Sequence, residues 1–398
     1  MSRNPWNRIP LTAVCASTDD IKCGPFGTQL NKEEFREEGV PLWGIKQVNV
    51  NFTIPTKEFL EPRTAKRLQQ YDLRPGDIVM TRKGTVGNCA VYPEHFEVGI
   101  MHSDLLRLRV DAARCEPSFL VHQLHHSPDV ERQLSLISGG AIMPGINVGR
   151  LKHLEVVLPP LAEQRRIAEV LDRAEALRAK RRAALAQLDA LTQSIFLDMF
   201  GDPVINPKKW PRKVFSEVGT LDRGVSKHRP RNAPELLGGS YPLVQTGEVA
   251  NCNGYIREYH STYSEAGLRQ SKMWPSGTLC ITIAANIAKT GILTFNACFP
   301  DSIVGFRAED PATVEFVRSW LSFLQKSLED AAPESAQKNI NLALLRSLTV
   351  PVPPITLQRE FARRVAAVEA LKTAQRASLA ELDALFASLQ HRAFRGEL

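Results

Sequence analysis

Apolar residues recur at alternating steps of three and four over residues 161–200, a stretch that contains neither Pro nor Gly. This heptad spacing predicts one long helix whose apolar stripe packs against another helix. A helix of ~40 residues would be roughly 60 Å long. Pro159-Pro160 before the stretch and Gly201-Asp202-Pro203 after it mark its two ends. The predicted seam consists of Ile167, Val170, Ala174, Leu177, Arg181, Ala184, Leu188, Leu191 and Ile195.

The same pattern returns 194 residues later, after Pro353-Pro354. Between residues 146–200 and 340–394, about 23 of 55 aligned positions are identical without a gap. A tandem duplication of this length predicts two similar units in one polypeptide. The second seam consists of Phe361, Val368, Leu371, Leu382, Leu385 and Leu389, with Arg364, Gln375 and Ser378 at weaker positions.

Neither predicted helix buries its stripe alone, and the nearest partner for each is the other copy. An antiparallel pair closes a pseudo-twofold with a single linker and would place the globular pieces at opposite ends of the coil, so we favour it over a parallel pair. The alternative is that each helix packs against its own domain. The polar seam residues Arg181 and Gln375 would fix the register of the pair.

The segments between the repeats contain short strand-like runs broken by Gly and Pro. Turns with Pro and Gly introduce two predicted strands, residues 77–81 and 278–282. Apolar and basic residues alternate over Leu105–Val110, which predicts a half-buried strand, whereas Pro117–Leu134 has a more helical pattern.

We therefore predict an α+β chain in which two pseudo-symmetric mixed α/β domains are separated by two long helices paired as an antiparallel coiled coil. The predicted segments are a first domain at 1–158, a first spacer helix at 159–203, a second domain at 204–352 and a second spacer helix at 353–398.

Composition and charge narrow the class of protein. The chain has 398 residues, 43% hydrophobic and 23% charged, as expected for a globular protein of two to three domains. It has no long uncharged apolar run and no apolar signal core, so we expect a cytoplasmic protein without a membrane span. The seven irregularly spaced cysteines indicate reduced thiols. A net charge of +7 is compatible with a polyanionic partner but does not require one.

The repeated motif resembles type I restriction–modification specificity subunits. The first copy consists of Gly145-Ile146-Asn147-Val148 followed by Leu158-Pro159-Pro160-Leu161-Ala162-Glu163-Gln164-Arg165. The second copy consists of Gln337 to Asn341 followed by Val352-Pro353-Pro354-Ile355 and Gln358. The ending His391–Leu398 is also similar to the family. The resemblance covers the whole chain in order: variable domain, helix, variable domain, helix.

The resemblance implies that each variable domain reads one half of a split sequence in double-stranded DNA. It implies that the paired helices set the unread gap and dock two methyltransferase subunits, and that motor-nuclease subunits join this core. For docking, the motif positions Gln164, Arg165, Gln358 and Arg359 are the candidates. It implies that the chain itself is not an enzyme and needs no cofactor.

The residues themselves offer no catalytic constellation: phosphate-loop, zinc-protease and serine-hydrolase motifs are absent from the sequence. His122, His125 and His126, near Cys115, are the nearest approach to a metal-ligand cluster. His122 and His126 lie one helical turn apart, but a metal needs three or four oriented ligands. A plain surface face or a face near phosphate is the alternative, and we predict no metal.

In the first domain, base-reading chemistry gathers at two places. Thr81, Arg82 and Lys83 put a basic pair on a Gly-containing turn at a strand end. Lys46 is followed by Gln47, Asn49 and Asn51, which alternate with Val48 and Val50; this predicts a strand with an amide row on one face. The alternative is a solvated edge strand with a charged turn. Removing Arg82 and Lys83 should weaken DNA binding by about 1–3 kcal/mol if one of them contacts guanine in a bidentate manner.

In the second domain, the densest basic run of the chain spans residues 223–231 and suits a loop along DNA phosphates. A merely solvated loop is the alternative. Short motifs of the two domains match at an offset of 201 residues. This match relates further second-domain residues to the first-domain candidates. The second-domain candidates are Arg223, Ser226, Lys227, Arg229, Gln245, Thr246, Asn286 and Lys289. A non-catalytic coiled-coil scaffold with incidental nucleic-acid binding is the alternative to a DNA reader, and salt-sensitive binding to DNA distinguishes the two.

Overall fold

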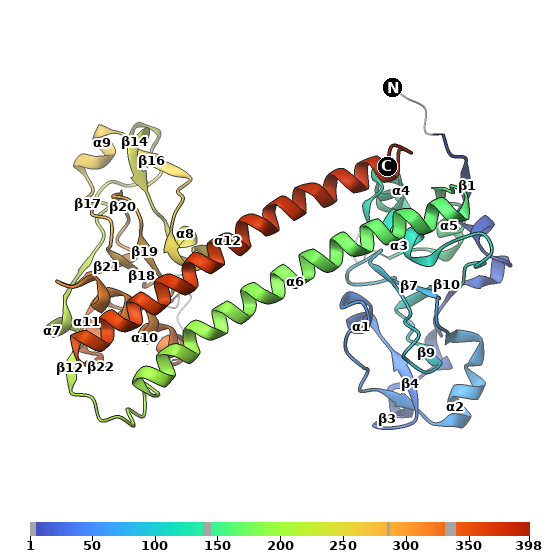
Figure 1. The fold of residues 1–398 in the computed structure, drawn as a ribbon, viewed down its shortest axis with the longest axis horizontal. Coiled ribbons are helices and arrows are strands. Elements are labelled where there is room, and N and C mark those ends of the chain that lie inside the picture. The colour runs from blue at the N-terminus through green and yellow to red at the C-terminus, as the bar shows by residue number, and fades with distance from the viewer. Residues whose placement is uncertain (1–4, 138–144, 285–286, 331–339) are drawn as a thin grey trace. The chain divides into compact units, whose positions relative to one another are not determined.

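The computed structural model describes residues 5–137, 145–284, 287–330 and 340–398. They form two compact units, one comprising residues 1–182 with 377–398 and the other residues 183–376 (Figure 1). Each unit combines a mixed α/β body with a segment of both long helices, α6 (Leu161–Phe200) and α12 (Ile355–Ala393). The predicted fold class of two mixed α/β domains and two long helices is therefore confirmed. The boundary between the units falls inside each helix, not at its ends.

Two sheets build the first body. Its strands are β1 (Arg8–Pro10), β2 (Ile21–Cys23), β3 (Phe35–Arg36), β4 (Val40–Trp43), β5 (Phe59–Leu60), β6 (Asp72–Leu73), β7 (Ile78–Thr81), β8 (Cys89–Val91), β9 (Gly99–Met101), β10 (Leu105–Leu108) and β11 (Glu155–Val157). Its helices are α1 (Ile45–Asn49), α2 (Pro62–Arg67), α3 (Pro117–His126), α4 (Pro128–Ile137) and α5 (Val148–Leu151). The sheets have the orders β2-β10-β7-β8 and β3-β5-β4-β9-β6, and β1 pairs with β11.

The second body repeats this plan. Its strands are β12 (Arg212–Val214), β13 (Thr220–Arg223), β14 (Leu237–Leu243), β15 (Gly254–Ile256), β16 (Ser261–Tyr263), β17 (Met273–Trp274), β18 (Leu279–Thr282), β19 (Thr290–Leu293), β20 (Ala297–Cys298), β21 (Ile303–Arg307) and β22 (Thr349–Pro351). Its helices are α7 (Phe215–Val218), α8 (Thr246–Asn251), α9 (Glu265–Arg269), α10 (Pro311–Asp330) and α11 (Leu342–Ser347). The orders β13-β21-β18-β19-β15 and β16-β14-β20-β17 match the first body except for one edge strand in each body, β3 in the first and β15 in the second. The pairs β4–β9 and β14–β20 are both parallel. The duplication therefore includes the bodies.

The strand β10 corrects one expectation. All of Leu105–Leu108 is buried, including Arg107, so the half-buried strand predicted from alternation is wrong. The Arg107 guanidinium donates to Oδ1 and to the main-chain oxygen of Asp72, at 2.8 and 2.7 Å. Burial alone would raise the pKa of Asp72, but its contacts with Arg74 and Arg109 lower it. The buried charge of Arg107 is tolerated here because the Asp72 carboxylate pairs with it at 2.8 Å.

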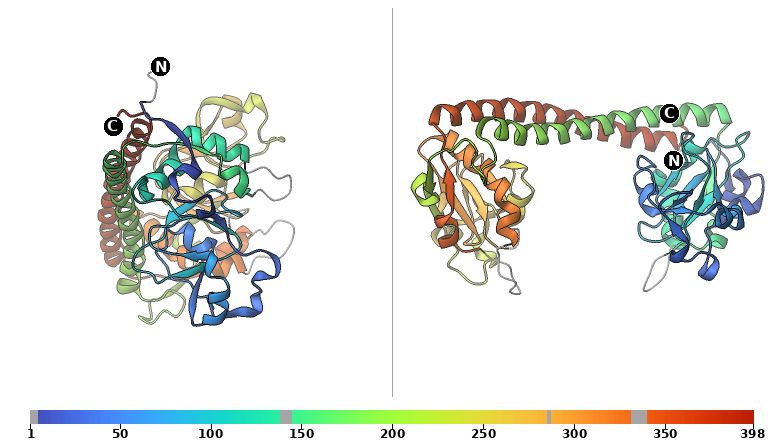
Figure 2. Two further views of the ribbon diagram at one scale, coloured as in Figure 1. Left: turned by 90° about the vertical axis from the view of Figure 1, so that its right-hand side faces the viewer. Right: turned by 90° about the horizontal axis from the view of Figure 1, so that it is seen from below.

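The two long helices run antiparallel within each unit. In the first unit Arg178 of α6 meets Asp383 and Phe386 of α12, whereas in the second unit Phe196 of α6 packs on Phe361. Each unit's body also lies against one side of its helix segments, through the clusters around Phe119 and Phe316 (Figure 2). Pairing between helices and packing on the body, posed as alternatives, therefore occur together.

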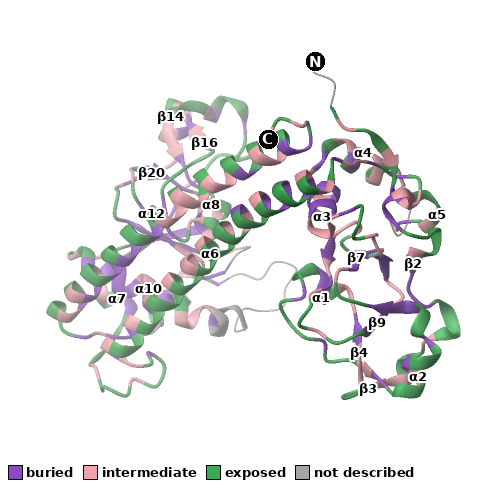
Figure 3. Ribbon diagram, turned by 45° about the vertical axis from the view of Figure 1, so that its right-hand side comes forward, coloured by how far each residue is buried: buried purple, intermediate pink, exposed green. Residues whose placement is uncertain are grey.

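The observed seam agrees with the predicted one at some positions and differs at others. Ile167 and Ala174 of α6 and Phe361 and Val368 of α12 are buried as predicted, and Leu171, Val365 and Lys372 are buried in addition. Four predicted seam leucines are instead half exposed, because the bodies draw neighbouring positions inward: Leu177 (49%), Leu191 (44%), Leu371 (55%) and Leu385 (51%). Green bands along the outer faces of both helices show the same exposure (Figure 3).

A charged triad occurs once in each unit. Arg178 contacts Glu175 and Asp383 in the first unit, whereas Lys372 contacts Glu369 at 2.8 Å and Asp189 at 2.9 Å in the second. The two triads are related by the offset of 194 residues. Each triad joins α6 to α12. Arg178 and Lys372 lie three residues before Arg181 and Gln375, the two residues that the sequence predicts to fix the register. Because the pairs cross between the helices, we assign the triads a share in fixing the register.

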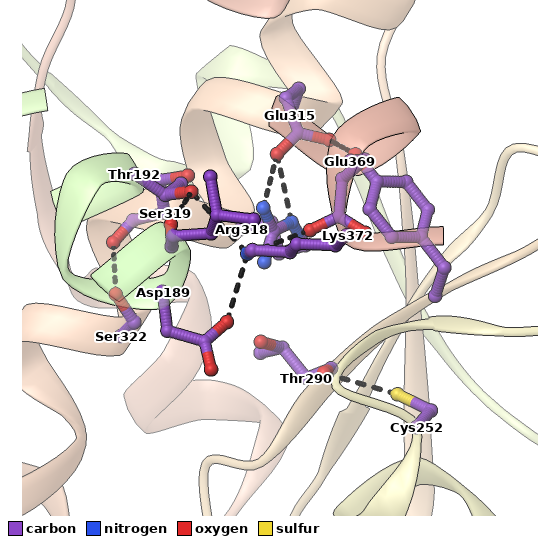
Figure 4. Close-up of polar contacts among 12 residues, drawn as sticks. Asp189, Thr192, Cys252, Thr290, Glu315, Arg318, Ser319, Ser322, Glu369 and Lys372 are labelled. Carbon is purple, nitrogen blue, oxygen red and sulfur yellow. Dashed lines mark hydrogen bonds and ion pairs between the residues drawn. The ribbon is translucent and has the colours of Figure 1, made fainter. Parts of the chain in front are cut away.

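The second triad is built into a larger polar cluster (Figure 4). The side chain of Lys372 is only 5% exposed, and Glu369 beside it is 10% exposed. On the body side, Glu315 of α10 accepts hydrogen bonds from Arg318 and from the Tyr255 hydroxyl, at 2.9 and 2.7 Å. Buried charges are satisfied in this cluster by several partners each, as their desolvation requires.

Candidate nucleic-acid interface

The turn after β7 is held by the side chain of Thr81, one of the predicted readers. Thr81 is fully buried, and its hydroxyl donates to the carbonyl oxygens of Thr85 and, at 3.2 Å, Asn88. In the second body the hydroxyl of Thr282, at the end of β18, approaches the carbonyl of Lys289 at 3.3 Å and accepts from its amide at 3.0 Å. Thr81 therefore shapes the turn and does not reach DNA.

The basic pair that follows Thr81 divides into two roles. Arg82 is half-buried: its guanidinium lies over the Phe26 ring at 4.7 Å and donates to the carbonyl of Ile146 at 3.3 Å. The side chain of Lys83 is 48% exposed, and its ammonium pairs with Asp104 at 3.0 Å. Of the two, Lys83 is the group that a phosphate or base can approach.

Residues 45–49 form the helix α1, so the predicted strand with an amide row is wrong. Gln47 is buried and its side chain caps the first turn, accepting from the Gly44 amide at 3.3 Å. The Asn49 amide oxygen accepts from Thr85 and Asn88, at 2.7 and 2.9 Å, and so braces the turn after β7. The alternation of polar and apolar residues was misleading because a single helical turn buries Val48 and Gln47 together. Lys46 remains exposed.

Lys46 borders a pocket of about 670 Å³ in the first body. Its lining residues are Lys32, Phe35, Gly44, Ile45, Lys46, Gln47, Ile54, Pro55, Thr56, Lys57, Glu58, His102 and Asp104. Three lysines against two carboxylates give the lining a small positive excess. Lys32, Lys57 and His102 were missed by the sequence analysis, because no local motif marks them and the fold alone gathers them.

The basic run 223–231 leaves the sheet at the end of β13. Arg223 and Lys227 are exposed. Ser226 is buried, so it is not among the candidates that are accessible to DNA. The Arg229 guanidinium donates to the carbonyls of Ser226 and His228, at 2.6 and 2.8 Å, and pairs with Asp301 at 3.3 Å. Arg231 also pairs with Asp301. Residues 223–231 therefore form a loop that is held by its own hydrogen bonds, and two of its guanidinium groups pair with the Asp301 carboxylate.

The remaining second-body candidates lie at other strand ends. Gln245 is exposed and precedes α8, and Thr246 begins this helix. Lys289 is partly buried, with its amide bound to Thr282. Asn286 lies outside the described residues. Gln245, Thr246 and Lys289 are positioned by backbone turns that have counterparts in the first body.

The predicted docking residues also separate into two kinds. Gln164 is fully buried: its side chain accepts from the Glu116 amide at 2.9 Å and donates to the carbonyls of Arg114 and Pro159, at 2.9 and 2.8 Å. Gln358, also buried, donates to Pro353 at 2.8 Å. A buried amide that serves backbone groups is not available to a partner subunit, so these two assignments are corrected to structural roles.

Arg165 and Arg359 remain accessible, with side chains 61% and 66% exposed. They pair with Glu116 at 3.5 Å and Asp310 at 2.8 Å, respectively. The repeated Asn147 and Asn341 have a structural role, since each caps a short helix, α5 and α11, through its side-chain oxygen. The repeated Gln and Asn residues of the motif therefore stabilise the start of a helix.

The clustered histidines His122, His125 and His126 serve the fold. His122 contacts Asp172 at 2.7 Å, and His125 accepts from the Cys89 amide at 3.0 Å. Burial lowers the pKa of His126 to about 4, so this imidazole is neutral near pH 7. Within the described ranges, no three His, Cys, Asp or Glu side chains are grouped to hold a metal ion.

The seven cysteines are free thiols, all buried except Cys252, which is half-buried. Burial raises the pKa of Cys15 to about 11 and that of Cys115 to about 12, so neither is a ready thiolate. Among the helices that the structure describes, none has the length and apolar character needed to cross a bilayer.

Comparison with known proteins places this geometry in a family. Residues 21–187 and 207–383 each match the family described as type I restriction modification DNA specificity domain. The chain is 23% identical to the EcoBI specificity subunit of Escherichia coli, over 99% of this chain and 86% of that protein. It is 24% identical to the EcoKI specificity subunit of E. coli K12, over 98% and 90%.

A solved structure has the same fold. The S subunit of a type I restriction-modification system from M. genitalium superposes with a TM-score of 0.62 at 15% identity, over 99% of both chains. The duplicated bodies, the antiparallel helices and the two matched segments agree, and the chain belongs to the type I restriction modification DNA specificity family, with two target-recognition domains in tandem.

Proposed function

We propose that each body reads one half of a bipartite duplex DNA target, while α6 and α12 set the gap between the halves. The observation that carries this proposal is the repeated sheet plan with different chemistry at equivalent turns. Where the turn after β7 presents Arg82 and Lys83, the residues after β18 are Ile283 and Ala284. Two similar bodies with unlike loops suit two different half-sites.

Within this proposal, the recognition domains are residues 1–158 and 204–352, and the spacers are residues 159–203 and 353–398. The accessible reader candidates are Lys46, Lys83, Arg223, Lys227, Arg229 and Gln245. Recognition is the chain's contribution, whereas methyl transfer and DNA cleavage belong to methyltransferase and motor-nuclease subunits. Methylome sequencing of cells that carry the complete system tests this: a split motif that changes when this chain is exchanged supports it, and marks independent of the chain contradict it.

Lys83 and Arg82 should affect DNA binding through different mechanisms. Lys83→Ala should weaken binding of the assembled methyltransferase to its target duplex by about 1 kcal/mol and reduce the slope of log affinity against log salt by roughly one, because one phosphate contact is lost. Arg82→Ala should instead lower the thermal stability of the chain, since its guanidinium packs on Phe26. Fluorescence anisotropy across a salt series and thermal denaturation measure the two effects. An unchanged affinity and salt slope for Lys83→Ala would contradict its assignment.

The exposed leucines support two equivalent docking sites for methyltransferase subunits. Leu177 and Leu385 immediately precede Arg178 and Phe386, which are in contact in the first unit. Since each residue turns a helix by about 100°, positions that precede contacting residues on antiparallel helices turn to the same side. Leu191 and Leu371 precede Thr192 and Lys372 in the second unit in the same way. Each unit thus presents one pair of exposed leucines, on positions that the duplication repeats.

Changing one leucine pair should remove one partner. Leu177→Asn with Leu385→Asn should reduce the assembly from two methyltransferase subunits to one, because a half-exposed apolar pair becomes polar. Mass photometry of the co-purified complex measures the stoichiometry. Ala176→Asn with Ala384→Asn, at exposed neighbouring positions, is the matched control. Two bound subunits in the leucine variant would contradict this docking surface.

A further inference from the structure

Asp104 and Asp301 lie in equivalent turns of the two bodies. Asp104 directly precedes β10, and Asp301 lies two residues before β21. These strands hold the same place in their sheets, β10 between β2 and β7, and β21 between β13 and β18. The two turns also join the body in the same way: the amide of Gly24 donates to Leu105 at 3.0 Å, and the amide of Gly224 donates to Ile303 at 2.8 Å.

Both glycines are needed for the close approach of the turn. A Cβ atom on Gly24 would lie 2.1 Å from the His102 carbonyl oxygen, and one on Gly224 would lie 2.3 Å from that of Pro300. Each turn is therefore packed directly against the backbone that follows β2 or β13. An acidic residue on such a turn has a fixed position relative to the loops around it.

Each carboxylate holds basic side chains that belong to a loop or turn beside it. Asp104 pairs with Lys83 at 3.0 Å and contacts the His102 ring nitrogen at 3.4 Å. Asp301 pairs with Arg229 at 3.3 Å and with Arg231. The basic groups come from the turn after β7 in one body and from the loop after β13 in the other. Both bodies therefore have an acidic residue in this turn, whereas the basic residues that pair with it differ between the bodies.

The basic side chains of these ion pairs are exposed enough for a DNA phosphate to reach them. The side chains of Lys83, Arg229 and Arg231 are 48%, 55% and 45% exposed. Ion pairs at this exposure contribute little to folding stability. A phosphate group can therefore replace the carboxylate as partner of the basic groups. The carboxylate that remains nearby repels phosphate, so a DNA contact there is weakened unless base contacts offset the repulsion.

We propose that Asp104 and Asp301 are positioning residues that determine specificity, one for each half of the target. In free protein each holds its basic partners in one geometry, and on DNA each penalises contact with phosphates of non-target sequence. The inference rests on the proposed function, since it assigns a role within the reading of half-sites. It assigns that role to two acidic residues, whereas DNA contact is ordinarily sought among basic and amide side chains.

The test uses the chain assembled with its methyltransferase subunits. Asp301→Asn should raise affinity for a non-target duplex by roughly threefold and leave affinity for the target nearly unchanged, so that discrimination falls by the same factor. Methylome sequencing should show relaxed base preference in one half of the motif only. Asp104→Asn should relax the other half only.

Three controls make the outcome decisive. Glu309→Gln removes one negative charge beyond the other end of β21, where the side chain is exposed, and should leave discrimination unchanged. Asp301→Asn added to Arg231→Gln should reduce discrimination less than Asp301→Asn alone does, because Asp301 acts through the guanidinium groups. Thermal denaturation checks that the Asn variants are folded.

Different failures are distinguishable. A wild-type assembly that marks no split motif would overturn the proposed function. A wild-type split motif that both Asp variants leave unaltered in each half, or that both relax in the same half, would overturn this inference alone. An equal gain in affinity for target and non-target DNA would reduce the role of the carboxylates to general electrostatics and would also overturn it.

Discussion

Inserting seven residues into both long helices at once, after Ala183 in α6 and after Arg376 in α12, should widen the gap in the methylated motif by about three base pairs. One heptad adds ~10 Å of helix and preserves the apolar seam on both sides of the insertion. Base pairs stack at about 3.4 Å, so the added length corresponds to roughly three of them. Methylome sequencing with the variant chain measures the gap, and the bases in each half should stay the same.

The paired insertion is designed around the charged triads. Both insertion points lie between the triads, so Arg178 keeps its contact with Asp383, and Lys372 keeps its contact with Asp189. Four residues added to α6 alone near Ala184 would also change the spacing, but they would rotate the following helix by about 40° and break one set of contacts. Insertion of seven residues into α6 alone is therefore the control, and it should lower stability and methylation together. A paired insertion that leaves the gap unaltered would show that the helices do not set it.

Lys372→Met should lower the free energy of unfolding by about 3 kcal/mol. The substitution leaves Glu369, which is 10% exposed, without its nearest counter-ion, and an uncompensated buried charge is costly. Arg257 and Arg376 lie 3.5 and 3.7 Å from Glu369 and offset part of the loss. Chemical denaturation followed by circular dichroism measures the change.

The duplication provides a matched comparison for Lys372. Arg178→Met removes the equivalent cation of the first unit, where Glu175 and Asp383 are 41% and 44% exposed, so the loss should be about 1 kcal/mol. Glu369→Gln together with Lys372→Met should recover most of the stability lost in the single variant, because no buried charge is left unpaired. Equal losses for Arg178→Met and Lys372→Met would show that burial does not govern the strength of these triads.

The internal repeat of the sequence predicts the architecture of the chain. Heptad spacing depends only on local periodicity, so residues 161–200 and their copy were recognisable as helices from the sequence. The offset of 194 residues likewise revealed two units, and the antiparallel course followed from closing them with one linker. Strands β7 and β18 were marked by the turns before them, because Pro and Gly restrict the backbone locally.

The roles of individual side chains were harder to predict. Alternation at residues 46–51 suggested a strand, but the tertiary structure buries Gln47 in a helical turn. The repetition of Gln164 and Gln358 in the motif predicts docking positions, whereas their amides brace the start of each helix. A repeated residue shows that a position matters in both copies, but it does not say whether a partner or the chain's own backbone uses it.

By itself the sequence determined the tandem plan, the two long helices and the absence of familiar catalytic motifs, since each of these depends on local spacing; the antiparallel pairing was favoured because it closes the two units with one linker. Only the tertiary structure decided which face of each helix is buried, because the bodies compete with the partner helix for apolar contact. It also decided which basic groups stay accessible, because Asp104 and Asp301 meet Lys83 and Arg229 through sheet topology, across 21 and 72 residues of chain.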